Sequence, residues 1–354
     1  MVSRLNARDL QWFTGHFLLY KRIEVESMYK RKKNPEVMKG LDSLVFSVHT
    51  FKALQTHSME LYTQQGNKYG YVQCFSNRME FVLNLPKARG NTPDETNLIP
   101  YSLTDLIMIE LIRDDITEKL KAILGDNFTS SIKTCELSYN LPVGTNEEIN
   151  NLISILRNVF LEEKRQSAVY YIKSMNVRMN LQVAEASGYL SPLINGRMRF
   201  KVYNKGKELG LQQDYLRFEI ILMQRHLKRL FGREMSIRSI LTKEHLSRLL
   251  KEFRCIYENV IMPKISNELS NAVERLAYRM IETEKPVQAF LELQRYEQVY
   301  TLEVFRRALT KYYSYIDKDK DHRNNINRLC FYVKKQYGLN NRTLELFKEM
   351  HFNC

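Results

Sequence analysis

The hydrophobic and polar positions between residues 41 and 223 change repeatedly from a two-residue period to a helical one. A two-residue period predicts strands, because successive side chains of a strand point to opposite faces, whereas apolar residues three and four positions apart predict helices. The predicted helices are 104–124 and 146–164, and the predicted strands are 41–51, 70–75, 77–86, 133–142, 168–174, 177–185, the segment that contains Tyr203, and 215–223. This order predicts an α+β domain built around an antiparallel sheet.

Beyond residue 232 the pattern becomes almost wholly helical, with predicted segments near 242–258, 263–283, 286–294, 300–315, 323–336 and 341–349. We therefore predict an α+β domain over 41–232 and an all-helical C-terminal domain over 233–354. Residues 1–40 form a basic N-terminal extension, in which 6–30 have the length and composition of one or two helices. Its basic run at 30–33 fits either a solvated linker or an arm that contacts DNA.

The charge of the chain is uneven along its 354 residues. The formal net charge is +14, of which +5 falls within 1–40, +3 within 41–232 and +6 within 233–354. Such an excess favours a polyanionic partner. The five cysteines are scattered without CxxC spacing, and no apolar run is long enough to span a bilayer. We therefore expect a cytoplasmic protein without disulfides, a zinc site or membrane association.

The strand that contains Tyr203 has two sharply different faces. Met198, Phe200 and Val202 share one parity and are expected to face the core. The opposite parity carries Arg197, Arg199, Lys201, Tyr203 and Lys205. This basic face is either a solvated surface of the sheet or a place where a phosphodiester lies across a nucleophilic tyrosine.

Three predicted strands carry a glutamate opposite their apolar residues: Glu80, Glu136 and Glu219. If these strands belong to one sheet, the three carboxylates converge on the face of Tyr203. Clustered carboxylates suit Mg²⁺ or Mn²⁺, which prefer hard oxygen ligands. The alternative is that each glutamate is a solvated outer-face residue, as is common in half-buried sheets.

Two segments combine these residues in a more specific pattern, KVYNKGKEL at 201–209 and YLRFEIILMQRHLKRLFG at 215–232. They resemble the replication-initiator proteins of filamentous bacteriophages, the gene II and RstA-like group. In that family a strand ending in Tyr-x-Lys-x-x-Glu-Leu precedes an Arg-Phe-Glu strand and a basic helix. The matching positions here are Tyr203, Lys205, Glu208, Leu209, Arg217, Phe218 and Glu219. Residues 41–48, 133–158 and the Glu80 strand resemble further family elements, so the likeness covers most of 41–232.

The resemblance implies an endonuclease domain of the HUH-like, replication-initiation-factor type, which nicks one DNA strand at a phage origin and later reseals the displaced strand. Tyr203 would attack the phosphorus and form a 5′-phosphotyrosine, with Lys205 stabilising the developing charge. The resemblance assigns Mg²⁺ or Mn²⁺ to Glu136, Glu219 and Glu80, with Glu208 as a further ligand or hydrogen-bond partner. It assigns contacts with DNA phosphates to Arg197, Arg199, Lys201 and Arg217. Glu136 stands where many relatives have Asp, and 90–100 lacks the Gly-His-Asn segment of some members, so no histidine ligand is carried over.

The implied partners are double-stranded and single-stranded DNA at the origin and the helicase and DNA polymerase of a bacterial host, in whose cytoplasm the protein would act. Helices within 304–316 and 325–339 could form a helix-turn-helix that recognises the origin, or a packing module without DNA contacts. The oligomeric state stays open. Two rival functions remain: a plasmid or mobile-element relaxase with the same chemistry, and a non-catalytic DNA-binding regulator on this scaffold.

Overall fold

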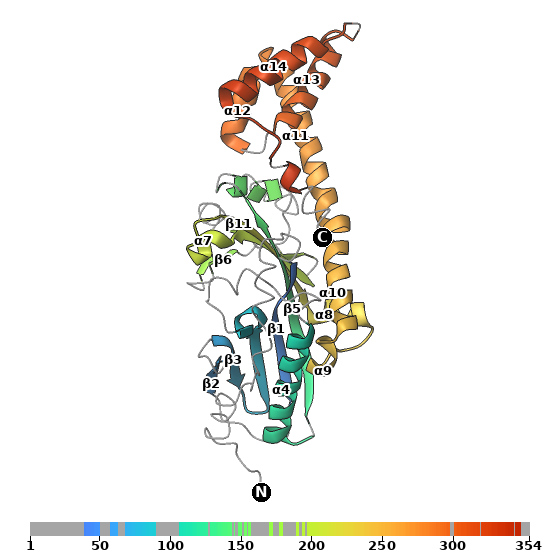
Figure 1. The fold of residues 1–354 in the computed structure, drawn as a ribbon. Coiled ribbons are helices and arrows are strands. Elements are labelled where there is room, and N and C mark those ends of the chain that lie inside the picture. The colour runs from blue at the N-terminus through green and yellow to red at the C-terminus, as the bar shows by residue number, and fades with distance from the viewer. Residues whose placement is uncertain are drawn as a thin grey trace. The chain divides into compact units, whose positions relative to one another are not determined.

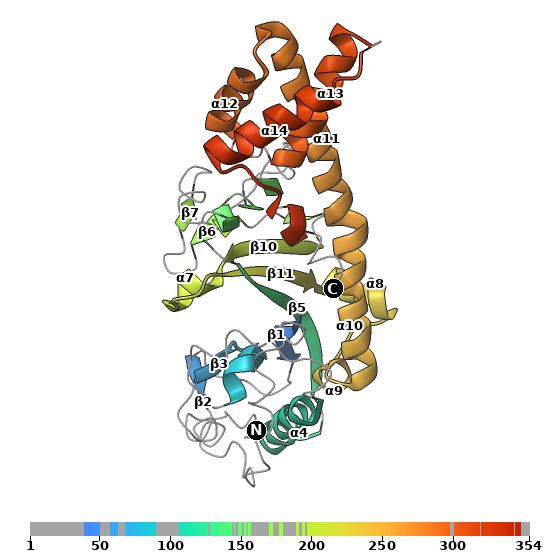
Figure 2. The ribbon, with the colours of Figure 1, turned by 45° about the horizontal axis from the view of Figure 1, so that its top comes forward.

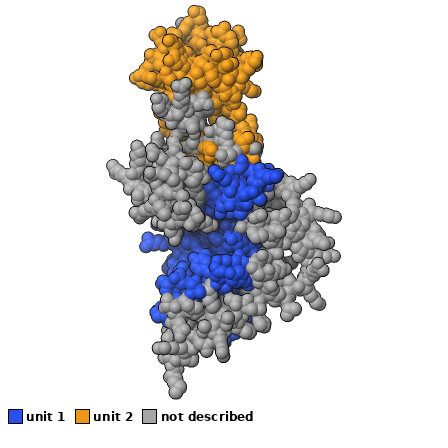
Figure 3. Space-filling view, turned by 90° about the vertical axis from the view of Figure 1, so that its left-hand side faces the viewer, with its two compact units in different colours: residues 1–142, 191–253 blue, residues 143–190, 254–354 orange. Residues whose placement is uncertain are grey.

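The computed structural model describes most of the chain from residue 39 onward, in two compact units. The first unit comprises residues within 1–142 and 191–253, and the second comprises residues within 143–190 and 254–354 (Figure 3). The predicted extension over 1–40 lies outside the described residues, apart from its last two. The described residues are 39–49, 57–62, 68–89, 106–126, 128–143, 145, 148–150, 152–153, 155–156, 170–172, 177–179, 189–190, 193–194, 197–297, 301–318, 320–342 and 344–347.

The first unit is built on a sheet in which seven strands follow the order β2-β3-β4-β1-β5-β11-β10 (Figures 1 and 2). Each neighbouring pair along this order is antiparallel, and short β9 also pairs with β10. The predicted α+β class with an antiparallel sheet is therefore confirmed. The strands are β1 (Lys39–His49), β2 (His57–Tyr62), β3 (Lys68–Cys74), β4 (Arg78–Asn84), β5 (Thr129–Pro142), β9 (Leu193–Ile194), β10 (Met198–Asn204) and β11 (Tyr215–Met223).

One face of this sheet is the hydrophobic core that the two-residue period predicts. Phe200 on β10 and Phe218 on β11 are both buried, with ring centroids 5.7 Å apart. The same face continues across β5 and β1 through Leu137 and Leu44, which are also fully buried. Burial of this apolar face fixes the register, because a slip by one residue would exchange the two faces. The opposite face is left with the polar side chains.

The strand around Tyr203 is shorter than its alternation predicts. Arg197 precedes β10 in a turn, and β10 ends at Asn204. The Asn204 side chain then caps α7 (Lys205–Leu209) by accepting a hydrogen bond from the backbone N–H of Lys207 at 2.9 Å. Lys205 is consequently the first residue of a helix and not part of the strand. Alternation could not reveal this end, because Lys205 keeps the parity of the strand.

The helices of the first unit are η2 (Leu85–Arg89), α4 (Leu106–Leu124), α7, α8 (Gln224–Phe231), α9 (Ile237–Ile240) and the start of α10 (Lys243–Ile256). The segment after residue 232 is tied to β5, since Ile132 N–H donates to the Met235 carbonyl at 2.9 Å. The buried His226 imidazole also pairs with Glu252 at 2.7 Å. These contacts place the unit's end at residue 253, whereas the sequence predicts a boundary at 232.

The second unit is helical over the described residues from 254 onward. Its helices are η4 (Tyr257–Ile261), α11 (Met262–Thr283), α12 (Pro286–Glu297), α13 (Leu302–Ile316) and α14 (Arg323–Tyr337), and its strands are β6 (Tyr170–Ile172), β7 (Val177–Met179) and β8 (Tyr189–Leu190). Leu276, Phe290, Phe305 and Val333 belong to one buried cluster that joins α11 to α14. No helix within the described residues is long and apolar enough to cross a membrane.

Two predictions concern the second unit. Within the predicted strands 168–174 and 177–185 the described residues 170–172 and 177–179 are strands, β6 and β7, which form an antiparallel pair separate from the large sheet, and the other residues of both predictions lie outside the described residues. The predicted helix-turn-helix would consist of α13 and α14, but residues 317–322 form a six-residue connection between them. A helix-turn-helix joins its helices through a turn of about three or four residues.

Candidate functional site

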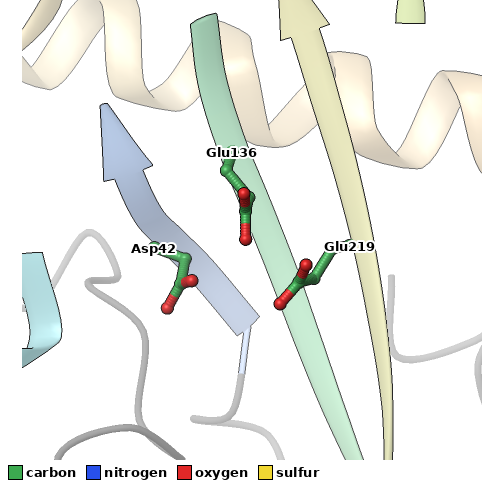
Figure 4. A group of neighbouring side chains, drawn as sticks. All are labelled: Asp42, Glu136 and Glu219. Carbon is green, nitrogen blue, oxygen red and sulfur yellow. The ribbon is translucent and has the colours of Figure 1, made fainter. Parts of the chain in front are cut away.

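Three carboxylates come together on the polar face of the sheet. Asp42 on β1, Glu136 on β5 and Glu219 on β11 each offer an oxygen atom, and these atoms lie within 4.8 Å of one another (Figure 4). They converge because β1, β5 and β11 are consecutive strands of the sheet. The group could hold a metal ion, and its oxygen ligands suit a hard divalent cation.

Asp42 reaches this face through a β-bulge. Leu41 pairs with Leu137 and Ser43 pairs with Glu136, so Asp42 is an extra residue on β1 without a partner on β5. Strict alternation would place Asp42 on the core face with Leu44. The bulge instead allows Asp42 and Ser43 both to lie on the Glu136 side, since a bulge re-aims side chains within a strand.

Arg217 joins two of the carboxylates from within the protein. Its side chain is buried, with Nη2 2.6 Å from Asp42 Oδ1 and Nε 2.7 Å from Glu219 Oε1. Nη1 also donates to Asn140 Oδ1 at 3.4 Å. A guanidinium presents several donors in a fixed plane, so it can hold both carboxylates in one arrangement. The structure therefore places Arg217 within the carboxylate group and not on an exposed surface.

Lys201 is the second cation of the site. Its Nζ lies 2.7 Å from Glu219 Oε2 and 3.2 Å from Glu136 Oε2, and its side chain is 14% exposed. In the register of the sheet Lys201 is directly opposite Glu219, and Glu219 is directly opposite Ser138. The ammonium group thus bridges two of the carboxylates that could bind a metal.

Tyr203 points into the same group. Its hydroxyl donates to Glu219 Oε1 at 2.6 Å, and the residue is only 7% exposed. Burial, and then the negative charge of Glu219, raise the pKa of Tyr203 well above its usual value. The phenol is therefore protonated at neutral pH, and its proton lies on a hydrogen bond to a carboxylate.

Lys205 lies beside this tyrosine at the start of α7. Its Nζ is 5.7 Å from the centre of the Tyr203 ring and 3.0 Å from Glu208 Oε2. Burial, and then the positive charge of Arg217, lower the pKa of Lys205. The next residue is Gly206, and a larger residue would not fit there, because its Cβ would lie 2.2 Å from the Gln213 carbonyl oxygen. The close approach of these two backbone segments holds the start of α7 against the residues that precede β11.

Glu136 and Glu219 have different surroundings, which shift their pKa values in opposite directions. Burial, and then the nearby charge of Glu219, raise the pKa of Glu136. Burial alone would also raise the pKa of Glu219, but Lys201 and Arg217 hold it well below its usual value. Three carboxylates therefore face two cations, and Glu136 is the carboxylate that favours a proton. A divalent cation in the group would favour the charged form of Glu136.

The remaining predicted site residues lie elsewhere. Glu80 on β4 pairs with Ser47, four residues along β1 from Ser43, which is about 13 Å of strand. It therefore does not belong to the carboxylate group, because β1 separates β4 from β5 and the register shifts it along the sheet. Arg199 shares the face of Lys201 and is partly buried, whereas Arg197 is exposed at the turn before β10.

A further observation supports the fit to a hard cation. The Ser138 hydroxyl is fully buried on the same face, between Glu136 and Asn140 along β5, and it has no hydrogen-bond partner among the described residues. A buried hydroxyl without a partner is unfavourable, and an ion or a water molecule beside the carboxylates would supply one. Asp42, Glu136 and Glu219 are the residues that would hold the ion.

The chain matches no protein-family model, and no curated protein matches its sequence.

Proposed function

We propose that the protein is a rolling-circle replication initiator, a metal-dependent endonuclease that nicks one DNA strand and later rejoins it. The observation that carries this proposal is the Tyr203 hydroxyl, which lies 2.6 Å from a carboxylate of a group that could hold a divalent ion. Two features support it further: the basic residues on the same face of β10 and the resemblance of 201–209 and 215–232 to phage initiators.

Tyr203 is the nucleophile of the proposed reaction. Its phenolic oxygen forms a bond to the phosphorus of the scissile phosphodiester while the bond from phosphorus to the 3′ oxygen breaks. The phenol proton leaves along the hydrogen bond to Glu219 and passes on to solvent water, because the low pKa of Glu219 does not let this carboxylate keep it. The departing 3′ oxygen takes up a proton from water to become a hydroxyl. The products are a 5′-phosphotyrosine and a free 3′ end, and the reverse reaction reseals the strand.

The neighbouring cations stabilise this reaction by their positions. Lys205, 5.7 Å from the Tyr203 ring, offsets negative charge that develops on the phenolic oxygen. Arg199 and Lys201 follow one another on the same face of β10 and would bind phosphates that flank the scissile bond. Arg217 keeps Asp42 and Glu219 in place. Mg²⁺ or Mn²⁺ on Asp42, Glu136 and Glu219 would supply charge stabilisation at the scissile phosphate.

The proposed function implies two partners from the bacterial host, which act at the origin in the host cytoplasm. A DNA polymerase would extend the free 3′ hydroxyl, and a helicase would separate the strands. A plasmid or mobile-element relaxase would perform the same strand transfer at its own origin, so the site chemistry is common to both. The two differ in the DNA sequence that is recognised.

One observation favours a second candidate, a non-catalytic DNA-binding regulator. Tyr203 is only 7% exposed, and a phosphodiester must reach its hydroxyl for attack. The two functions separate in one assay: protein is incubated with supercoiled DNA that carries its replicon's origin, with and without Mg²⁺ or Mn²⁺. The initiator converts the DNA to open circles only with metal, and Tyr203→Phe abolishes this conversion. Tight binding without a nick in either metal would refute the initiator and favour the regulator.

A further inference from the structure

Helix α14 of the second unit carries an unusual surface. It has four basic residues and no acidic residue over Arg323–Tyr337. Its Ile326, Cys330 and Val333 are buried in the core of the unit, so one side of the helix is already covered. On the remaining surface Phe331 is 67% exposed and Tyr332 is 47% exposed. Two neighbouring aromatic rings therefore face solvent among basic residues.

The spacing of these residues defines one face. Arg328, Phe331, Tyr332 and Lys335 stand at positions i, i+3, i+4 and i+7, which follow one another along one side of a helix. This set is called the α14 face. From Arg328 to Lys335 it extends over about 10 Å, at 1.5 Å per residue. That length suits two neighbouring nucleotides of a single strand, one base for each exposed ring.

No ion pair within the described part of the chain offsets the positive charge of the α14 face. Among the described residues none forms an ion pair with Arg328, Lys334 or Lys335. By contrast, Arg323 at the start of the helix pairs with Asp321 at 2.8 Å. A basic patch without acidic partners attracts a polyanion.

The exposed aromatic rings indicate which class of polyanion fits the α14 face. Exposed rings between cations match the way proteins bind single-stranded nucleic acid, in which bases stack on rings while cations follow the backbone. A duplex hides the faces of its bases and offers no such contact. An interfacial membrane helix buries a continuous apolar side in lipid, but here that side is occupied by the core of the unit.

We propose that the α14 face binds single-stranded DNA, with bases stacked on Phe331 and Tyr332 and phosphates held by Arg328 and Lys335. This binding site does not include Tyr203 or the carboxylate group, and it does not rest on the proposed nicking activity. If that activity holds, the displaced strand is the natural ligand.

The test measures binding of a fluorescein-labelled 20-residue oligothymidylate to the full-length chain by fluorescence anisotropy. We expect Phe331→Ala and Tyr332→Ala each to weaken binding about tenfold or more, the usual loss for one stacked base. The matched control is Tyr278→Ala on α11, because Tyr278 is 65% exposed but lies next to Glu274 and Glu282 on its own helix. This control should bind like the wild type.

Cross-linking gives a second, independent measurement. An oligonucleotide that carries 5-iododeoxyuridine should cross-link on illumination to Phe331 or Tyr332, as mapped by mass spectrometry. Unchanged affinity in a variant that combines Phe331→Ala with Tyr332→Ala, cross-links confined to other residues, or binding to anionic vesicles but not to the oligonucleotide would overturn the proposal. Tyr203→Phe should retain this binding, so a chain that binds through α14 but never nicks would refute only the proposed function.

Discussion

Replacing Lys201 by Met should make the protein less stable without metal and increase its affinity for a divalent ion. The ammonium group of Lys201 contacts Glu136 and Glu219 at 3.2 Å and 2.7 Å, the same carboxylates that would bind the ion. A divalent ion must therefore displace Lys201. If Glu136 also loses the proton that it favours, the Lys201 ammonium group and this proton are together exchanged for one divalent ion. The net charge of the site is then conserved.

The size of the effect follows from the burial of the pair. Removal of one partner of a buried ion pair costs about 3–5 kcal/mol, because the other charge remains in a poorly solvated position. Lys201 is 14% exposed and Glu219 is nearly inaccessible, so the lower end, about 3 kcal/mol, is expected here. An ion that no longer displaces Lys201 avoids a cost of this order, and each 1.4 kcal/mol is a factor of about ten in affinity. We therefore expect Mn²⁺ to bind Lys201→Met at least about tenfold more tightly than wild type.

Urea denaturation with and without Mn²⁺, together with calorimetric titration of Mn²⁺, measures both effects. The control is Lys228→Met, which removes an exposed pair with Glu234 at 3.6 Å and should change stability by less than about 1 kcal/mol. Equal Mn²⁺ affinity in wild type and Lys201→Met would refute the idea that Lys201 occupies the position of the ion. So would an Mn²⁺-induced gain in stability no larger than that of the control.

Three further predictions follow from the same geometry. Asp42→Asn should lower Mn²⁺ affinity tenfold or more in calorimetry, whereas Glu80→Gln, outside the carboxylate group, should leave it unchanged; equal losses would contradict this placement. Gly206→Ala should lower the free energy of unfolding by about 1–3 kcal/mol in urea, since its Cβ meets the Gln213 carbonyl, and an unchanged midpoint would contradict that contact. Because the folded pKa of Glu136 is raised, metal-free protein should lose stability as pH rises from the ordinary carboxyl range through that raised value, and denaturation midpoints that rise over this range would show the opposite sign.

The sequence predicts those parts of the site that depend on local alternation. Lys201, Tyr203 and Glu219 lie on one face because β10 and β11 are regular strands with one apolar side, and Glu136 follows the same rule on β5. Alternation does not predict the position of Asp42, because the bulge in β1 places its side chain on the face opposite to the one that alternation gives. An aspartate amid the apolar residues of a predicted strand was the only signal that could have indicated it.

The errors concern strand order and strand ends. Glu80 has the right parity, but its distance from Glu136 depends on the insertion of β1 between β4 and β5, which no local pattern encodes. Lys205 has the right parity and yet begins α7, since the Asn204 cap ends the strand. Long-range register and the competition between a cap and a strand are decided by tertiary contacts, so they appear only in the folded chain.

The most direct test of the central claim is the identity of the residue that becomes attached to DNA. The protein is incubated in Mn²⁺ with single-stranded oligonucleotides that together cover its replicon's origin, and covalent adducts are isolated under denaturing conditions and mapped by mass spectrometry. We predict one adduct, a 5′-phosphate on Tyr203, which is absent without metal and absent in Tyr203→Phe. Attachment to another residue, an adduct that persists in Tyr203→Phe, or tight DNA binding with no adduct would contradict the proposed function.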